Sequence, residues 1–278
     1  MSIARSVRVM GILNVTPDSF SDGGSFFDQQ TAVEQAQLLI EQGADIIDVG
    51  GESTRPYAET VDTVDELARV IPVIAAIRAY CTNSEYPHVS ISIDTSKAEV
   101  ARQALATGAD IINDVSALRN DPEMLEVVRQ SSAELIIMHM QGTPGTMQKN
   151  PCYEDVVKEV LEFFRQRLKV LSDAGIEPDR IIIDPGIGFG KNLSHNLQLI
   201  KHIEQLSELG HPVLLGHSRK RFLGDITGIE AAERDGVSSV VSALCLDKQV
   251  SIFRVHDVAA TKAALQVAMA IYQADQHD

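Results

Sequence analysis

The sequence predicts a (β/α)₈ barrel, a fold in which eight parallel strands alternate with helices. Along its 278 residues, short apolar and β-branched runs alternate repeatedly with longer amphipathic stretches. The runs do not alternate apolar with polar residues, as is typical of strands buried on both faces of a parallel sheet. The length also fits, because α/β barrels commonly need about 250 residues in one domain. We therefore expect residues 1–278 to form a single domain, and a doubly wound open sheet is the alternative.

The strands and several helices follow from these patterns in chain order. Strands are expected at residues 7–15, 45–49, 89–93, 110–115, 134–138, 180–183, 212–216 and 250–255. Helical patterns between them include residues 31–42, 97–107, 153–174, 196–209 and 258–273. In the first of these, Val33, Ala36, Leu39 and Ile40 recur at the spacing of one helical face.

Two units of the chain resemble each other. The segments GADIIDVG and GADIINDV begin at Gly43 and Gly108, and each places a glycine between a helical pattern and a strand. Glycine is the residue that best adopts the left-handed conformation at a helix C-terminus. The two segments are too far apart to be consecutive units, so a further unit with the strand at 89–93 lies between them. This regular repetition supports the barrel.

Composition limits the classes of partner. Lys and Arg number 24 and Asp and Glu 39, which gives a formal charge of −15. This charge argues against nucleic-acid binding through a broad basic face. The apolar run near the N-terminus is broken at Asn14, and no stretch approaches the roughly 18 apolar residues of a membrane span. Three widely spaced cysteines form no disulfide or zinc pattern. We expect a cytoplasmic protein with reduced thiols and no membrane partner.

Polar side chains follow every expected strand. They are Asn14, Asp48, Glu52, Asp94, Asn113, Asp114, His139, Asp184, Ser218, Lys220, Arg254 and His256. Any one of them alone could cap a helix or start a turn, and His139 is as consistent with a packed histidine as with a catalytic one. Such residues at all eight ends are harder to explain structurally. Because barrel active sites lie at the C-terminal ends of the strands, we expect a functional site there.

These residues divide into two chemical groups. Asp94, Asn113 and Asp184 suit a planar heterocycle rich in N–H donors and carbonyl acceptors. A basic group at the last two strands suits phosphate oxygens, and it comprises Lys220, Arg254 and His256 with Arg219 and Arg221 close by. Barrel phosphate sites often form at these last loops, although the segment RKR alone could equally be a solvated loop.

Two early loops have the composition of flexible segments over a site. NVTPDSFSDGG begins at Asn14 and carries Phe20, and GGESTRP begins at Gly50 and carries Arg55. The first is longer than an ordinary strand–helix connection. By contrast, GIGFGK at residues 186–191 lacks the glycine spacing of a dinucleotide-binding motif or a P-loop.

Taken together, several segments resemble the dihydropteroate synthase family. They are MGILNVTPDSFSDGG, DVGGESTRP, SIDTSKAEVARQAL, GADIINDVSAL, MHMQGTPGTMQ, DPGIGFGK, SRKRFLG and RVHDV, which occur in the family's order over about residues 8–260. The resemblance implies a pterin-binding barrel, usually a homodimer, in folate biosynthesis. The implied enzyme transfers an alkyl group other than methyl: it joins 6-hydroxymethyl-7,8-dihydropterin diphosphate to p-aminobenzoate, forming 7,8-dihydropteroate and pyrophosphate. Sulfonamides mimic the aminobenzoate.

The resemblance also implies roles for individual residues. The pterin pocket would comprise Asp94, Asn113, Met138, Asp184, Phe189 and Lys220. The diphosphate would meet Asn14, Arg254 and His256, with Mg²⁺ on Asn14 and the phosphate oxygens. The aminobenzoate would lie near Phe20, Thr54, Arg55, Pro56, Phe189, Lys220 and Arg221, and Asp22 would help order the loops.

The implied chemistry separates charge, because departure of the diphosphate leaves a cationic methylene on the pterin. Mg²⁺, Arg254 and His256 would stabilise the leaving oxygens. Asp94, Asp184 and Lys220 would hold the ring, so these three and the two diphosphate contacts are the expected catalytic residues. Closure of the two early loops would exclude water, the competing nucleophile.

Three residues depart from the family's common pattern, and other functions stay open. Arg221 stands where many members have Ser, Ala117 replaces the commoner Gly, and His217 precedes SRK where a smaller residue is usual. We expect His217 to pack rather than to make turnover pH-sensitive. One alternative function is a methyltetrahydrofolate-binding methyltransferase domain that works with a corrinoid, and another is a non-catalytic pterin-binding paralogue. The chain could also work within a larger folate-enzyme assembly.

Overall fold

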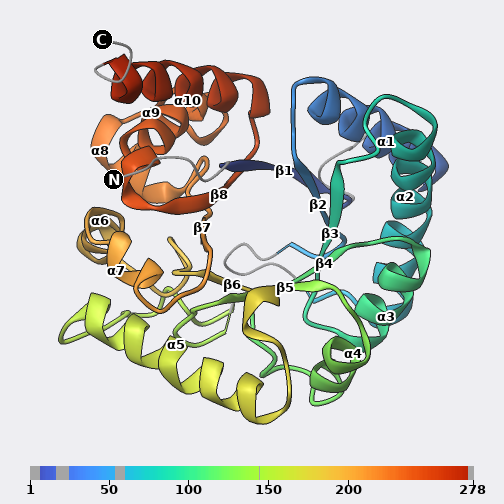
Figure 1. Cartoon of the computed structure of the whole chain (residues 1–278), viewed down its shortest axis with the longest axis horizontal. Coiled ribbons are helices and arrows are strands. Elements are labelled where there is room, and N and C mark those ends of the chain that lie inside the picture. The colour runs from blue at the N-terminus through green and yellow to red at the C-terminus, as the bar shows by residue number, and fades with distance from the viewer. Residues whose placement is uncertain (1–6, 17–24, 54–59, 144, 275–278) are drawn as a thin grey trace.

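Eight parallel strands close into a barrel in chain order, with β1 paired to both β2 and β8. The computed structural model describes residues 7–16, 25–53, 60–143 and 145–274, with the side chains of 25–28 left aside. Helices surround the strands as an outer ring (Figure 1). The closed order confirms the predicted (β/α)₈ barrel and excludes the open sheet.

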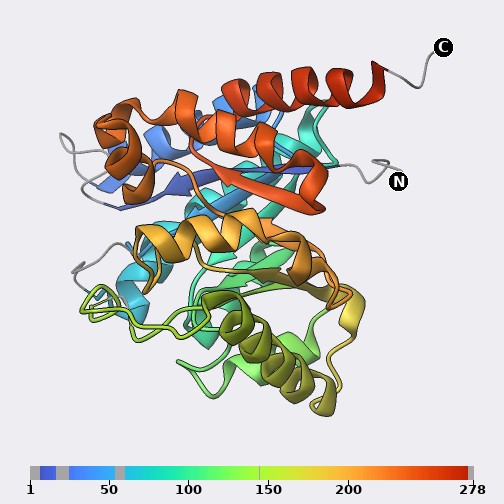
Figure 2. The ribbon, with the colours of Figure 1, turned by 90° about the vertical axis from the view of Figure 1, so that its left-hand side faces the viewer.

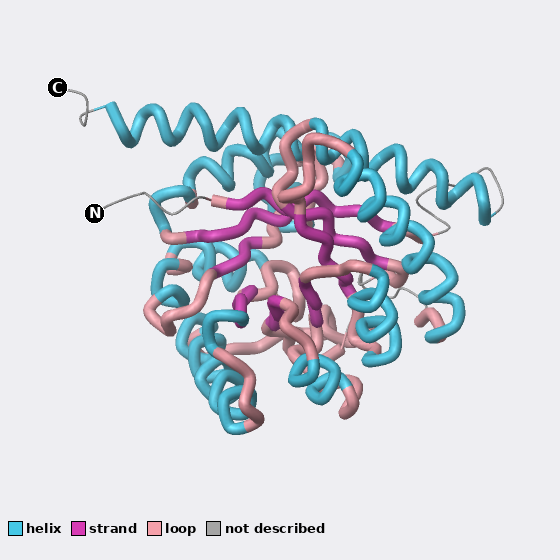
Figure 3. Tube along the Cα trace, turned by 45° about the vertical axis from the view of Figure 1, so that its right-hand side comes forward, coloured by secondary structure: helices cyan, strands magenta, loops and turns pink. Residues whose placement is uncertain are grey.

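The strands agree closely with their predicted positions. They are β1 Arg8–Asn14, β2 Ile46–Gly50, β3 Ser90–Asp94, β4 Ile111–Asp114, β5 Glu134–Met138, β6 Ile181–Asp184, β7 Val213–Leu215 and β8 Val250–Val255. Seen as a tube, these strands lie inside the layer of helices (Figure 3).

The helices differ more from the sequence patterns. They are α1 Ser25–Glu41, α2 Thr63–Asn83, α3 Ala98–Thr107, α4 Met124–Gln130, α5 Val156–Asp173, α6 Leu193–Lys201, α7 Glu204–Ser207, α8 Arg221–Thr227, α9 Asp235–Leu244 and α10 Val258–Gln273. The helix expected at 258–273 is confirmed, with Asp257 as its N-cap. The helix expected from residue 31 begins at Ser25, and the pattern at 196–209 is two helices, α6 and α7. No helix in the described ranges is both long and apolar enough to cross a membrane.

The glycines of the two similar segments adopt the conformation that their position predicts. Gly43 and Gly108 have φ angles of +95° and +114°. Gly108 ends α3, and the chain then enters β4 after two residues. A residue with a side chain would be strained at either position, because few L-residues adopt positive φ angles.

The apolar core has two layers, separated by the sheet. The larger layer fills the space between strands and helices. The smaller lies inside the barrel and comprises Met10, Ile46, Ile111, Ile136, Ile182, Leu214 and Ile252, one from each of seven strands. In β3, the register places the buried Ser92 beside Ile111. These inward-facing residues define which side chains reach the barrel mouth.

Candidate active site

The inward face of each strand continues from the core into the barrel mouth. Side chains on a strand alternate between its two faces, so the residue two positions beyond an inward core residue also points inward. The residues two positions beyond the barrel core are Asp48, Asn113, Met138, Asp184 and Arg254. Asp94 lies two beyond the buried Ser92, and Asn14 lies four beyond Met10. Six of the strand-end residues predicted from the sequence, together with the expected pocket wall Met138, therefore share one face.

Arg254 of β8 links the carboxylates of Asp48 on β2 and Asp94 on β3 at the barrel opening. Its Nε lies 2.6 Å from Oδ2 of Asp48, and one Nη lies 2.8 Å from Oδ2 of Asp94. Asn113 donates a hydrogen bond of 3.1 Å to the same oxygen of Asp48. Burial raises the pKa of Asp94 to about 7, and the nearby Arg254 opposes that rise. The arrangement leaves Oδ1 of Asp48 buried without a hydrogen-bond partner among the residues that the structure describes.

Asp184 and Lys220 bring opposite charges near each other after β6 and β7. Oδ1 of Asp184 accepts a hydrogen bond of 2.7 Å from the backbone N–H of Gly186. Burial raises the pKa of Asp184, against the effect of the Lys220 charge. The Nζ of Lys220 lies 4.2 Å from the centre of the Phe189 ring and donates to the carbonyl of Ile187. Burial lowers the pKa of Lys220 to about 7, while Asp184 favours its charged form.

The loop after β6 is held by a buried lysine that the sequence did not single out. The Nζ of Lys191 lies 2.9 Å from the carbonyl oxygens of Gly186 and Phe189, 3.2 Å from that of His139, and 3.0 Å from the Nδ1 of His139. Gly186 has a φ of +68°, and a Cβ there would lie 2.0 Å from the His139 carbonyl oxygen. Lys191 and this close approach together fix the wall that carries Phe189. His139 is a packed residue, and burial followed by the Lys191 charge lowers its pKa to about 2.

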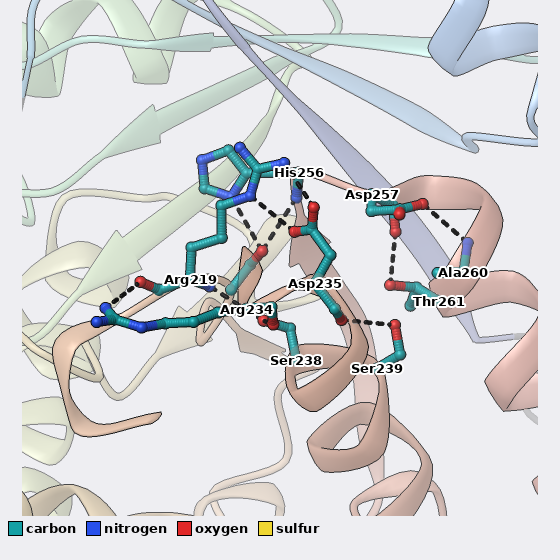
Figure 4. A network of polar contacts seen from close by, with 10 residues as sticks. Arg219, Arg234, Asp235, Ser238, Ser239, His256, Asp257, Ala260 and Thr261 are labelled. Atoms are coloured by element: carbon teal, nitrogen blue, oxygen red, sulfur yellow. Dashed lines mark hydrogen bonds and ion pairs between the residues drawn. The ribbon is translucent and has the colours of Figure 1, made fainter. Parts of the chain in front are cut away.

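The segment after β7 places its three basic residues in different environments. Arg219 was expected beside phosphate oxygens, but its guanidinium forms two hydrogen bonds of 2.7 Å with the carboxylate of Asp235 on α9 (Figure 4). Two of its guanidinium nitrogens are therefore engaged by a carboxylate, and a phosphate contact at Arg219 stays a prediction. Arg221 begins α8 with a side chain that is 89% exposed, and among the described residues it forms a 3.5 Å ion pair with Asp225. Only Lys220 of the three is directed to the carboxylates of the mouth.

His256 follows β8 and is engaged by Ser218, which follows β7. The hydroxyl of Ser218 lies 2.9 Å from Nδ1 of His256 and also accepts the backbone N–H of His256 at 3.2 Å. His217 behind this segment is fully buried, with Nε2 2.8 Å from the carbonyl of Ser238. Burial lowers the pKa of His217 to about 4. His217 thus packs in the interior, as expected, and does not face the mouth.

The remaining predicted contacts lie in the two early loops. Phe20, Asp22, Thr54, Arg55 and Pro56 are outside the described residues. At the described base of the second loop, Lys97 forms ion pairs with Glu52 and with Glu66, a fully buried carboxylate of α2.

Sequence reasoning did not single out several residues that hold this site. Lys191, Lys97, Glu66 and Asp235 all stand away from strand ends or outside any spaced motif. The sequence does contain one signal for Lys191, because it is the charged residue of the otherwise uncharged loop PGIGFGK.

The fold and the site define a pterin-binding barrel, and comparison with known proteins agrees. A family model described as "Pterin binding enzyme" matches residues 10–256. The dihydropteroate synthase of Synechocystis sp. is 44% identical over 266 residues, covering 95% of this chain and 90% of that protein.

Two solved structures of the Xanthomonas albilineans dihydropteroate synthase extend the likeness. The structure with 4-aminobenzoic acid is 46% identical with a TM-score of 0.88, and the complex with 7,8-dihydropteroate is 43% identical with a TM-score of 0.85. Each covers 100% of this chain and 96% of that chain. The chain therefore belongs to the dihydropteroate synthase family of pterin-binding enzymes. This membership decides against the methyltransferase alternative.

Proposed function

We propose that this chain condenses 6-hydroxymethyl-7,8-dihydropterin diphosphate with p-aminobenzoate to give 7,8-dihydropteroate and pyrophosphate. The C–O bond at the pterin methylene breaks, and its electron pair leaves with the diphosphate. The arylamine nitrogen then forms the new C–N bond and loses a proton. The observation that carries the proposal is the convergence of carboxylates and cations at the mouth of a barrel whose relatives are dihydropteroate synthases.

The pterin ring is assigned to the face formed by Asp94, Asn113 and Asp184. Carboxylate and amide oxygens accept hydrogen bonds from the ring's N–H groups, and a buried carboxylate strengthens such bonds because little water competes. Met138 and Phe189 supply apolar surface for the ring faces. Lys220, held between Asp184 and Phe189, is suited to donate to a ring acceptor or to the aminobenzoate.

The diphosphate is assigned to Asn14, Arg254 and His256. Arg254 binds Asp48 and Asp94 through Nε and one Nη, and its other Nη forms no hydrogen bond with the described residues, which makes it suitable for a phosphate oxygen. As negative charge develops on the leaving oxygens, positioned donors of this kind lower the barrier.

Mg²⁺ is assigned to the side-chain oxygen of Asn14 together with phosphate oxygens of the substrate. Asn14 shares the inward face of β1 with Met10, and Mg²⁺ usually combines one or two protein oxygens with substrate phosphates and water. The described part of the chain contains no group of three or more His, Cys, Asp or Glu that could hold a metal. When bound, Mg²⁺ would neutralise charge on the diphosphate.

The aminobenzoate is assigned to the outer part of the mouth, beside Phe189, Lys220 and Arg221. The early-loop residues Phe20, Thr54, Arg55 and Pro56 complete this proposal on the strength of the family resemblance. Arg221 supports it less than Lys220 does, because its side chain extends into solvent.

A three-component assay tests the function. We expect pyrophosphate release only when pterin diphosphate, p-aminobenzoate and Mg²⁺ are all present, and we expect a sulfonamide to compete with p-aminobenzoate. Tight pterin binding without pyrophosphate release would instead identify a non-catalytic paralogue.

We also propose that the enzyme is a cytoplasmic homodimer. Cys81, Cys152 and Cys245 are free thiols, which supports a reducing compartment. The packed helices α9 and α10 expose Val240, Leu244, Val267 and Ile271 with exposed fractions of 56%, 65%, 62% and 69%. An apolar surface of this kind is suited to a second copy of the chain.

A further inference from the structure

We infer that Ser218 is a positioning residue that holds His256 with a hydrogen on Nε2, the ring nitrogen suited to face the leaving diphosphate. The inference rests on the proposed function, because that function places the diphosphate beside His256. Two contacts carry it: the Ser218 hydroxyl lies 2.9 Å from Nδ1 of His256 and 3.2 Å from the backbone nitrogen of the same residue.

The hydrogen-bond donors and acceptors around Ser218 determine which ring nitrogen of His256 carries the hydrogen. The backbone N–H of His256 can only donate, so the Ser218 oxygen accepts there. The hydroxyl hydrogen is then directed to Nδ1, which must accept it in neutral imidazole. If Nδ1 instead carried the hydrogen, the hydroxyl of Ser218, which is buried, would have no acceptor among the residues described. The bond made at one ring nitrogen thus sets the hydrogen on the other.

Ser218 is itself held rigidly from both sides. On one side, Nε2 of His217 lies 2.8 Å from the carbonyl of Ser238, in α9. On the other, Arg219 has a φ of +56°, its N–H donates to the Ser238 hydroxyl at 3.1 Å, and its guanidinium binds Asp235. Figure 4 shows the Arg219 side of this network, with Asp235 and Ser238 of α9. These contacts fix the backbone on both sides of Ser218, whose hydroxyl is directed toward His256.

This tautomer of His256 is suited to donate a hydrogen bond to the diphosphate. Neutral imidazole with its hydrogen on Nε2 donates to a phosphate oxygen, whereas the other tautomer would present a lone pair to it. Protonated imidazole carries hydrogens on both nitrogens, so Nε2 donates in either charge state. Ser218 thus keeps a donor directed at the developing charge, as the partner of a ligand histidine does in metal sites.

Nitrogen NMR on protein labelled with ¹⁵N-histidine tests the tautomer without any substrate. The His256 signals are assigned by their loss in His256→Gln, at about pH 9, where an ordinary imidazole is neutral. We expect wild-type His256 to carry its hydrogen on Nε2 and Ser218→Ala to show a mixture of tautomers. A wild-type hydrogen on Nδ1, or an unchanged tautomer in Ser218→Ala, would overturn the inference.

Kinetics tests the role in the reaction. We expect Ser218→Ala to lower kcat/KM for pterin diphosphate roughly tenfold, the lower end of the usual loss for such positioning partners. The KM for p-aminobenzoate should change little. Ser239→Ala is the matched control, because among the described residues the Ser239 hydroxyl bonds to the Asp235 carbonyl of its own helix, 3.0 Å away, and not to His256.

Equal losses in Ser218→Ala and Ser239→Ala, or a loss confined to p-aminobenzoate, would contradict the positioning role. The two proposals fail differently. If wild-type protein releases no pyrophosphate, the proposed function is wrong, while the NMR result still decides how Ser218 orients His256.

Discussion

Burial controls the proton affinity of the histidine behind the mouth. His217 is fully buried, and its pKa is about 4, below the value of about 6.5 for an exposed histidine. Between these values, the unfolded chain binds a proton that the folded chain does not. The folded state is therefore favoured above pH 6.5 and loses that advantage as the pH falls toward 4.

Replacing this histidine should reduce the acid sensitivity of folding. We expect His217→Gln to flatten the decrease in unfolding free energy between pH 6.5 and 4, by up to about 1.4 kcal/mol per pH unit. Urea unfolding at several pH values measures this slope. His88→Gln is the control, because His88 is exposed. Parallel slopes for wild type and His217→Gln would show that His217 is protonated in the folded protein.

The carboxylate of Asp184 should matter for the pterin substrate rather than for the fold. Asp184→Asn keeps the size of the side chain and an oxygen for the Gly186 N–H, but it removes the charge beside Lys220. We expect kcat/KM for pterin diphosphate to fall at least about tenfold, with a smaller change in the KM for p-aminobenzoate. Steady-state assays varying each substrate separate the two effects, and Asp173→Asn on the surface of α5 is the control. A change in the p-aminobenzoate KM alone would remove Asp184 from the pterin pocket.

At the scale of elements, the loop between β6 and α6 depends on one buried ammonium. Lys191 donates to three backbone carbonyls in the interior, those of His139, Gly186 and Phe189, and the Gly186 carbonyl also accepts the N–H of Phe189. We expect Lys191→Met to destabilise folding by about 2–3 kcal/mol and to speed amide hydrogen exchange at residues 186–190. Because this loop carries Phe189 and the Ile187 carbonyl that binds Lys220, the KM for pterin diphosphate should rise.

Hydrogen exchange followed by mass spectrometry measures the loosening of this loop. Lys201→Met, an exposed lysine on α6, is the matched control. Unchanged exchange in residues 186–190 of Lys191→Met would show that the remaining contacts, such as the 2.8 Å bond from Gly188 N–H to Asn196, hold the loop without the lysine.

The elements differ in how far their sequence determines them. All eight strands were predictable because apolar runs buried on both faces have few alternatives, and the alternation of side chains then places Asp94, Asn113 and Asp184 at the mouth. The break between α6 and α7 has no marker in the apolar spacing of residues 196–209. The pairing of Arg219 with Asp235 could not be predicted in the same way. It depends on how α9 packs against the segment after β7, and the position of Arg219 after a strand does not indicate that packing.

At the scale of the whole molecule, the barrel leaves an apolar surface on one side. Helices α9 and α10 lie side by side on the outside of the barrel, as the orange and red helices of Figure 2 show. Val240 and Leu244 of α9 and Val267 and Ile271 of α10 are among the most exposed large apolar residues described. A second copy covering this surface would remove it from water, which is the main driving force for such association.

The molecule's charge sets how that association should respond to salt. Each chain carries a formal charge of −15, so two copies repel each other, and salt screens this repulsion. We expect sedimentation at micromolar concentration to show a dimer that tightens as the salt concentration rises. Leu244→Glu combined with Ile271→Glu should give a monomer, because four carboxylates would be buried in the paired state. Val64→Glu on α2 is the control, with a similarly exposed side chain on another helix. A monomeric wild type, or a dimer that survives the double substitution, would place any association of this enzyme on a different surface.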